Sequence, residues 1–179
     1  MTANQPPWPR EWLMTDERIG DRLWKAIDAL PEGGAGIVLR HYSLSGGERN
    51  RLARQVSDIC GQRDLVLAVA RDRELAADVG AQLVHNPLAR PNGLPISRSA
   101  HSAEEAAAAN RAGASLIFLS PMCETRSHPG RKAMAVDLAR QIVAGSTVPV
   151  IALGGMNRAR LAEFADVGFY GWAGIDAWL

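Results

Sequence analysis

The sequence is poor in cysteine, has almost no charge imbalance and contains no long apolar run. The two cysteines, Cys60 and Cys123, belong to no C-x-x-C pair, so neither a disulfide framework nor a zinc ribbon is predicted and a reducing cytoplasm is favoured. A count of 20 basic against 19 acidic residues leaves a net charge of +1, which argues against nucleic acid or an anionic membrane as the main partner. No stretch reaches the roughly 18 apolar residues of a membrane span. The proline-rich residues 1–10 have no apolar core of a signal peptide, and we expect them to be flexible in a cytoplasmic protein.

Short apolar runs alternate with amphipathic segments, which is typical of repeated βα units and a parallel sheet. Strands are expected at Trp12–Met14, Gly36–Arg40, Leu65–Ala70, Leu83–His85, Ile96–Ser99, Leu116–Leu119, Val148–Leu153 and Gly168–Ala173. Eight strands in 179 residues predict one (β/α)8-barrel domain over residues 1–179, close to the lower size limit of that fold. An open doubly wound sheet is the alternative, but no G-x-G-x-x-G follows the first strand.

Helices are expected after most strands, starting at capping residues such as Thr15 or Asp16, near Asp72, and at Ser102. Their apolar positions are Ile19, Leu23, Trp24 and Ile27; Leu52, Val56 and Ile59; Met134, Leu138 and Ile142; and Leu161 and Phe164. No full helix fits between the fourth and fifth strands, and little room remains for a helix after the eighth. The sequence therefore predicts a barrel whose last helix is reduced or missing. We expect a second subunit of a homodimer, or the N-terminal segment, to cover that flank, with Trp172 and Trp178 at the contact.

Residues able to take part in chemistry follow the expected strands. Barrel enzymes build their active sites from these loops. The candidates are Asp16; Arg40 and His41; Arg71 and Asp72; His85; Ser99 and His101; Thr125, Arg126, Ser127 and His128; Gly154 and Gly155; and Asp176. All four histidines fall in this set. Loops are polar for structural reasons too, so the clustering is a stronger indication of a binding site than any single member.

Two adjacent glycines, Gly154 and Gly155, follow the buried seventh strand. Without Cβ atoms their backbone N–H groups can close around an oxyanion at the start of a helix. A phosphate site is one interpretation, since the loops after the last two barrel strands commonly bind phosphate. A tight turn that needs glycine for its geometry is the other. Asp176 lies near the same loops, and its carboxylate would repel a phosphate unless it points away.

The order of several motifs resembles the thiamine phosphate synthase and thiazole tautomerase superfamily of (β/α)8 barrels. The matching segments are Leu13–Asp16, Val38–Arg40, Asp78–His85, Ser99–Ala106, Ser120–His128 and Pro149–Met156. The resemblance spans nearly the whole chain and implies a transferase of thiamine biosynthesis. Such an enzyme joins hydroxymethylpyrimidine diphosphate to thiazole phosphate, with magnesium and basic residues helping the diphosphate to leave.

The resemblance also implies roles for individual residues. Arg40 matches the family's diphosphate-binding arginine, Ser99 its serine after strand five and Thr125 its threonine after strand six. Gly154 and Gly155 match the glycines that bind the thiazole phosphate. We take Arg40, Ser99, Thr125 and His128 as the candidate catalytic residues. The candidate phosphate ligands are Arg40, Arg71, His101, Arg126, Ser127, Gly154, Gly155 and Asp176.

Several family positions carry different residues here. The Asn-Asp pair whose aspartate binds magnesium falls on Ala70 and Arg71, which leaves Asp72, one position further on, as the candidate metal ligand. The second metal aspartate has no counterpart, because His85 runs into Asn86, Pro87 and Leu88. A magnesium site prefers carboxylate oxygens, so magnesium is a doubtful cofactor.

Further family positions differ in charge. The family's loop lysine is His128, the lysine near Arg40 is Tyr42, and the serine after strand eight is Asp176. Arg71 and Arg126 could supply positive charge in place of a metal.

Three interpretations follow. The first is a thiamine phosphate synthase-like enzyme with altered diphosphate handling. The second is a metal-independent, tautomerase-like isomerase; its family histidine falls on Pro121, so His128 or His101 would have to replace it. The third is a non-catalytic binding or regulatory protein, for which the missing metal carboxylates are the evidence. All three bind small phosphorylated thiazole or pyrimidine ligands, and we favour the first.

Overall fold

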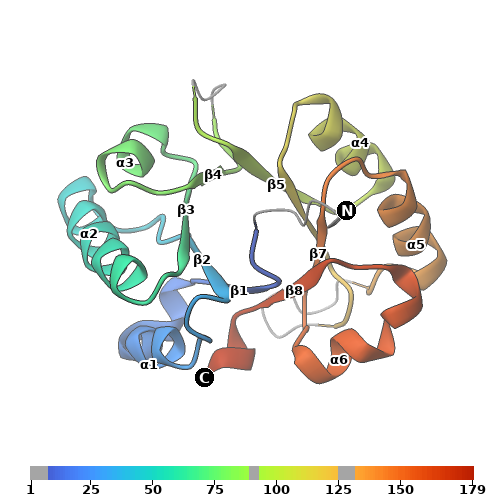
Figure 1. Cartoon of the computed structure of the whole chain (residues 1–179), viewed down its shortest axis with the longest axis horizontal. Helices are drawn as coiled ribbons and strands as arrows, with labels where there is room; N and C mark the ends of the chain where they lie inside the picture. The colour runs from blue at the N-terminus through green and yellow to red at the C-terminus, as the bar shows by residue number, and fades with distance from the viewer. Residues whose placement is uncertain (1–7, 89–92, 125–131) are drawn as a thin grey trace, which may run out of the picture.

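The computed structural model describes residues 8–88, 93–124 and 132–179. Within these residues, eight parallel strands pair in chain order, and β8 pairs with β1 to close a barrel. The strands are β1 (Glu11–Met14), β2 (Ala35–Leu39), β3 (Val66–Ala70), β4 (Leu83–His85), β5 (Ile96–Ala100), β6 (Leu116–Leu119), β7 (Val150–Leu153) and β8 (Gly171–Gly174). Helices α1 to α6 lie around this ring (Figure 1). The (β/α)8 barrel predicted from the sequence is confirmed.

The helices follow the strands as the βα pattern predicts. They are α1 (Leu23–Asp28), α2 (Gly46–Gln62), α3 (Arg73–Asp78), α4 (Ala103–Arg111), α5 (Val136–Gly145) and α6 (Arg158–Glu163), with 3₁₀ segments η1 (Glu17–Arg22), η2 (Ala165–Val167) and η3 (Asp176–Trp178). Asp16, Asp72 and Ser102 accept backbone N–H groups as N-caps of η1, α3 and α4. Between β4 and β5, the described residues 86–88 and 93–95 form no helix.

Side chains from alternate strand positions fill the interior of the barrel. The rings of Trp12 and Phe118 meet edge to face there, with centroids 5.5 Å apart. Gly36 makes room for Trp12, because a Cβ at position 36 would lie 2.5 Å from its ring. The other strand positions face outward and pack against the helices in a second buried cluster.

Some expected boundaries were wrong by a few residues. Met134 precedes α5, and Phe164 follows α6. Gly168 ends η2 in a left-handed conformation with φ +86°, so β8 begins three residues later than expected. Trp24, expected at an apolar helix position, is 38% exposed on α1.

The flank between β8 and α1 is covered by the end of the same chain. Trp178 on η3 stacks on Trp172 with ring centroids 4.8 Å apart, and its Nε1 donates to the carbonyl of Trp12 at 3.1 Å. Both stacked side chains are buried. The expectation that a second subunit or the N-terminal segment covers this flank, with Trp172 and Trp178 at the contact, was wrong about what covers it, because the reduced eighth helix, η3, buries both tryptophans within one chain. A homodimer stays a prediction.

The substitution Trp178→Phe is expected to lower the free energy of unfolding by about 1–2 kcal/mol, because it removes the indole N–H and with it the hydrogen bond to the Trp12 carbonyl. Urea denaturation measures this loss. Trp24→Phe, the same substitution at an exposed position, should change stability by less than about 0.5 kcal/mol. An equal loss of stability in the two variants would show that Trp178 on η3 does not cover the flank between β8 and α1.

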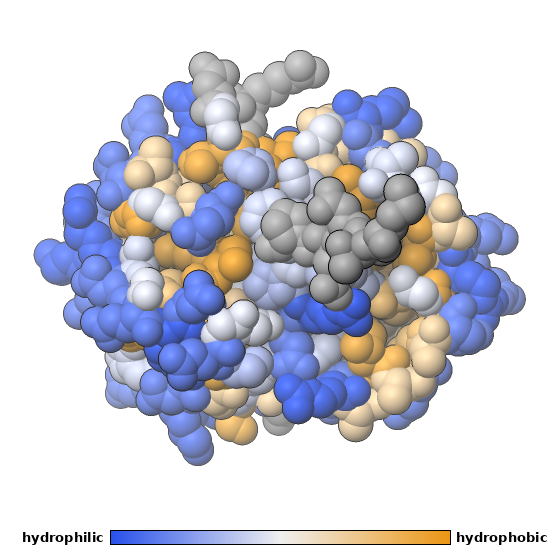
Figure 2. Space-filling model, viewed as in Figure 1, coloured by the Kyte–Doolittle hydropathy of each residue, from blue (hydrophilic) through white to orange (hydrophobic). Residues whose placement is uncertain are grey.

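The outer rim of the molecule is mostly hydrophilic where the helices face outward, and hydrophobic residues appear nearer the centre of the face in view (Figure 2). No helix in the described part of the chain is long and apolar enough to cross a membrane.

Candidate active site

A cavity of about 620 Å³ opens at the carboxyl ends of the strands. Its size is ordinary for a small-molecule site. It is lined by residues at or beyond the carboxyl ends of β1, β2, β5, β6, β7 and β8: Asp16, Arg40, Ser99, His101, Ser120, Pro121, Glu124, residues 153–157, Arg160 and residues 174–177. The sequence-predicted Arg40, Ser99, His101, Gly154, Gly155 and Asp176 thus come together in one cavity.

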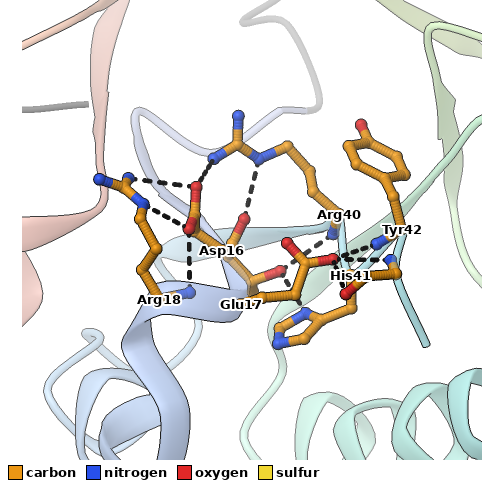
Figure 3. A network of polar contacts seen from close by, with 8 residues as sticks. Asp16, Glu17, Arg18, Arg40, His41 and Tyr42 are labelled. Carbon is orange, nitrogen blue, oxygen red and sulfur yellow. Dashed lines mark hydrogen bonds and ion pairs between the residues drawn. The ribbon is translucent and has the colours of Figure 1, made fainter. Parts of the chain in front are cut away.

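Arg40 is held at the edge of the cavity by the turn that follows β1. Its Nε donates to the carbonyl of Thr15 at 2.8 Å, and its backbone N–H donates to the Thr15 hydroxyl at 2.9 Å. The Asp16 carboxylate lies between two guanidinium groups, with Arg40 Nη2 at 3.5 Å and Arg18 Nε at 2.7 Å (Figure 3). Two adjacent residues of this turn therefore orient Arg40, whose side chain lines the cavity and is 22% exposed.

The charges of this group stabilise one another. Burial raises the pKa of Asp16, but hydrogen bonds and charge from Arg18, helped by Arg40, outweigh it and hold the pKa below its usual value. Burial lowers the pKa of Arg40, while Asp16 acts in the opposite direction. Asp16 is therefore ionised at neutral pH and anchors Arg40 as a cation.

His41 faces the barrel wall. It is buried, with its Nδ1 3.1 Å from the Thr15 hydroxyl, and it does not line the cavity. Burial lowers the pKa of His41. His41 therefore supports the turn after β1 in its neutral form.

Two structural features require glycine at both positions of the pair after β7. Gly154 and Gly155 adopt left-handed conformations, with φ of +93° and +66°. A Cβ on Gly154 would lie 2.9 Å from the Cα of Pro121, and one on Gly155 would lie 2.9 Å from the Cβ of Cys123. The segment after β6 packs on the pair, and Cys123 N–H donates to the Gly154 carbonyl at 2.9 Å. Among the described residues, the two glycine N–H groups have no backbone partner, so the turn geometry and an anion site are compatible.

Arg71 and Asp72 lie outside the cavity lining. Arg71 adopts φ +67° and places its guanidinium over the Tyr42 ring, 4.3 Å from the centroid. Asp72 uses one carboxylate oxygen to cap α3 at Leu75 and the other to accept from Arg49 at 3.2 Å. The structure therefore gives both residues local structural contacts, and the phosphate and metal contacts expected from the sequence stay predictions.

The described residues do not fit a magnesium site. Both oxygens of Asp72 have protein partners, and Asn86 follows β4 where the family has carboxylates. Within residues 8–88, 93–124 and 132–179, no three histidine, cysteine, aspartate or glutamate side chains gather to hold a metal ion.

His101 lines the cavity but is tied to its own helix. Its backbone N–H and its Nδ1 both contact the carboxylate of Glu105 at 2.8 Å. Nε2 is the ring atom left for a ligand. Thr125, Arg126, Ser127 and His128 lie outside the described residues, and so do residues 1–7 of the expected N-terminal segment.

Sequence reasoning missed several cavity residues, among them Glu124, Asn157 and Arg160. Arg160 donates to the carbonyl of Gly155, and Asn157 caps α6. An N-cap and a basic residue in the first turn after a glycine pair were visible in the sequence, and they could have indicated these two positions.

Comparisons with known proteins identify related sequences and a similar fold. The profile of a family described as thiamine monophosphate synthase matches residues 12–178. The thiamine-phosphate synthase of Streptomyces avermitilis is 32% identical over 89% of this chain and 80% of its own length. That of Geobacillus kaustophilus is 30% identical over 85% of this chain and 77% of its own length. The fold is similar to a thiamine phosphate pyrophosphorylase structure from Pyrococcus furiosus, with a TM-score of 0.81, 23% identity and coverage of 94% and 86% of the two chains.

Proposed function

This chain belongs to the thiamine monophosphate synthase family, and from that premise we propose that it forms thiamine phosphate from hydroxymethylpyrimidine diphosphate and thiazole phosphate. The bond between the pyrimidine methylene carbon and the diphosphate oxygen breaks, and diphosphate leaves with the electron pair. The thiazole nitrogen then forms a C–N bond to the resulting pyrimidine cation. The products are thiamine phosphate and diphosphate, so no oxidant or reductant is needed.

One observation carries this proposal: Arg40, Ser99 and the Gly154–Gly155 pair line a single cavity. Arg40 stabilises the negative charge that develops on the leaving diphosphate, as preorganised cations do when charge grows in a transition state. Ser99 donates a hydrogen bond to the same class of ligand. The N–H groups of the glycine pair receive the phosphate of the thiazole on the other side of the cavity.

The charge around the cavity is mixed. Asp16 contacts Arg18 and Arg40, the charge of Asp176 also acts on Arg18, and the cavity is further lined by Glu124 and Arg160. Glu124 and Asp176 are suited to lie near the positive charge of the thiazolium ring in the product.

The curated relatives are named as synthases, and this supports synthase activity over the tautomerase and non-catalytic interpretations. Pro121 stands at the position of the tautomerase histidine, and His101 already contacts Glu105. Of the two histidines that could replace it, His101 keeps its Nε2 for a ligand and His128 lies outside the described residues, so the preference for the synthase rests on the names of the relatives.

Isothermal titration of each substrate tests the proposal. We expect both ligands to bind the wild-type chain saturably, with weaker binding of the pyrimidine diphosphate to Arg40→Met and weaker binding of the thiazole phosphate to Gly154→Ala. Saturable binding of neither ligand would overturn the proposal.

Magnesium binding gives a separate prediction. Because the described residues do not fit a metal site, titration of Mg²⁺ into the ligand-free chain should give no saturable heat at millimolar concentration. The variant Asp72→Asn serves as control and should titrate like wild type, since Asp72 is engaged by Arg49 and Leu75. Saturable binding that is lost in Asp72→Asn would contradict this and establish Asp72 as a metal ligand.

A further inference from the structure

A buried polar network lies between β4 and β5, next to the cavity. His85 is 1% exposed and lies among the side chains of the barrel interior, with its ring edge to face with Phe118. Its Nδ1 is 3.0 Å from the Ser97 hydroxyl, and its Nε2 is 3.3 Å from the Ser99 hydroxyl. The Asn86 amide nitrogen lies 3.1 Å from His85 Nε2 and 3.1 Å from the Ser99 hydroxyl. Of these four residues, Ser99 lines the cavity.

The orientation of the Asn86 amide is determined by its partners. The backbone N–H of Ser99 donates to Asn86 Oδ1 at 2.9 Å, so the other terminal atom is the NH₂ group. The backbone at Asn86 is fixed as well, with φ +46° and its N–H donating to the Ser97 carbonyl at 2.8 Å. Asparagine is one of the few residues that adopt such a φ without much strain. The NH₂ group is therefore directed at His85 Nε2 and at the Ser99 hydroxyl.

This orientation determines the protons of the network. An NH₂ group donates only, so His85 Nε2 has to be unprotonated and Nδ1 carries the hydrogen that is donated to Ser97. Burial lowers the pKa of His85 to about 3, with the charges of Arg40 and Arg98 acting in the same direction, so the ring stays neutral at physiological pH. The Ser99 oxygen accepts from Asn86, and Nε2 already has a donor. The Ser99 proton is thus available for an acceptor in the cavity.

We propose that Asn86, together with neutral His85, is a positioning residue that makes the Ser99 hydroxyl a hydrogen-bond donor to a phosphorylated ligand in the cavity. This inference rests on the proposed function, because it names a phosphate or diphosphate oxygen as the acceptor. The position after His85, where Asn86 stands, thereby gains a role in binding. Asn86 itself does not touch the ligand.

The proton arrangement can be tested without a ligand. Long-range ¹H–¹⁵N NMR of the His85 ring in the wild-type chain should show the Nδ1–H tautomer, unchanged between pH 5 and pH 8. The variant Asn86→Asp replaces the NH₂ donor by an acceptor of the same shape, so Nε2 should gain a proton. A wild-type ring protonated at Nε2, or an Asn86→Asp ring that keeps the wild-type tautomer, would overturn the inference.

Affinity tests the consequence for Ser99. In Asn86→Asp the Ser99 hydroxyl donates to the new carboxylate, so the phosphorylated substrate that Ser99→Ala weakens should bind about tenfold less tightly. Leu88→Asp places the same charge two residues along, at a side chain that is 82% exposed, and should leave affinity unchanged. Asn86→Ala keeps the Nδ1–H tautomer but frees Nε2 to accept the Ser99 proton, so affinity should fall while the NMR signature stays.

A double-mutant cycle separates positioning from a merely structural role. If Asn86 acts through Ser99, then Asn86→Asp should have little further effect on affinity in the Ser99→Ala background. Additive losses would overturn the inference. If the wild-type chain binds neither substrate, the proposed function fails, and the His85 tautomer in wild type and Asn86→Asp still decides the proton arrangement.

Discussion

Replacing Arg40 by methionine is expected to lower kcat/KM for thiamine phosphate formation by about 100- to 1000-fold, the usual effect of removing one preorganised donor at developing charge. Arg40 is the strongest candidate because two neighbouring residues of the turn after β1 hold its guanidinium. Its Nε is tied to the Thr15 carbonyl, and Asp16 holds its terminal nitrogen. Methionine fills the volume of the side-chain stem but supplies no charge. Steady-state kinetics with the pyrimidine diphosphate as varied substrate measures the effect.

Arg40→Lys is the matched control for Arg40→Met. Lysine keeps the charge but has no planar fork to contact the Thr15 carbonyl and a ligand at once, so it should recover only part of the lost activity. The free energy of unfolding of both variants should stay within about 2 kcal/mol of wild type. If the Arg40→Met variant kept the kcat/KM of the wild type, Arg40 would have no role in the reaction.

Gly154→Ala should lower kcat/KM by about 100-fold, because displacement of a substrate-positioning turn by even 1 Å has effects of that order. Alanine at φ +93° is strained, and its Cβ would meet the Pro121 Cα at 2.9 Å. The opposing atom belongs to the backbone, so the turn after β7 or the segment after β6 has to move. Strain of this kind should also lower the free energy of unfolding by about 1–3 kcal/mol.

Gly61→Ala is the control, because it makes the same glycine-to-alanine change at a position outside the turn after β7. Gly61 lies inside α2, and a Cβ there would meet no atom within 4 Å. Alanine should therefore raise the free energy of unfolding by about 0.5–1 kcal/mol and leave kcat/KM unchanged. If Gly154→Ala behaved like Gly61→Ala, the turn after β7 would not position a substrate.

Local patterns in the sequence predict most of the fold. β4 and β6 have the bounds expected from their apolar runs, and the caps at Asp16 and Ser102 follow from side chains that compete for N–H groups at helix starts. The cluster at the carboxyl ends of the strands follows from the parallel topology. These features depend on neighbours in sequence or on the sheet as a whole.

Contacts between particular side chains are not encoded in such patterns. The hydrophobicity of Trp172 and Trp178 indicates burial but not that one covers the other within the same chain. Likewise, Arg71 and Asp72 carry the right charges for a ligand, yet a left-handed φ and a cap position direct them to Tyr42 and Arg49. The role of Asn86 depends on three contacts with two residues, His85 on β4 and Ser99 on β5, so it becomes visible only with the coordinates.

Product formation tests the central claim most directly. Wild-type and Arg40→Met protein would be incubated with hydroxymethylpyrimidine diphosphate and thiazole phosphate, with and without magnesium, and thiamine phosphate and released diphosphate would be quantified by chromatography. The proposed function predicts equal amounts of the two products from the wild-type chain and a loss of about 100-fold or more in Arg40→Met. Saturable binding of both substrates without product under either condition would contradict it and identify the chain as a binding protein of this family.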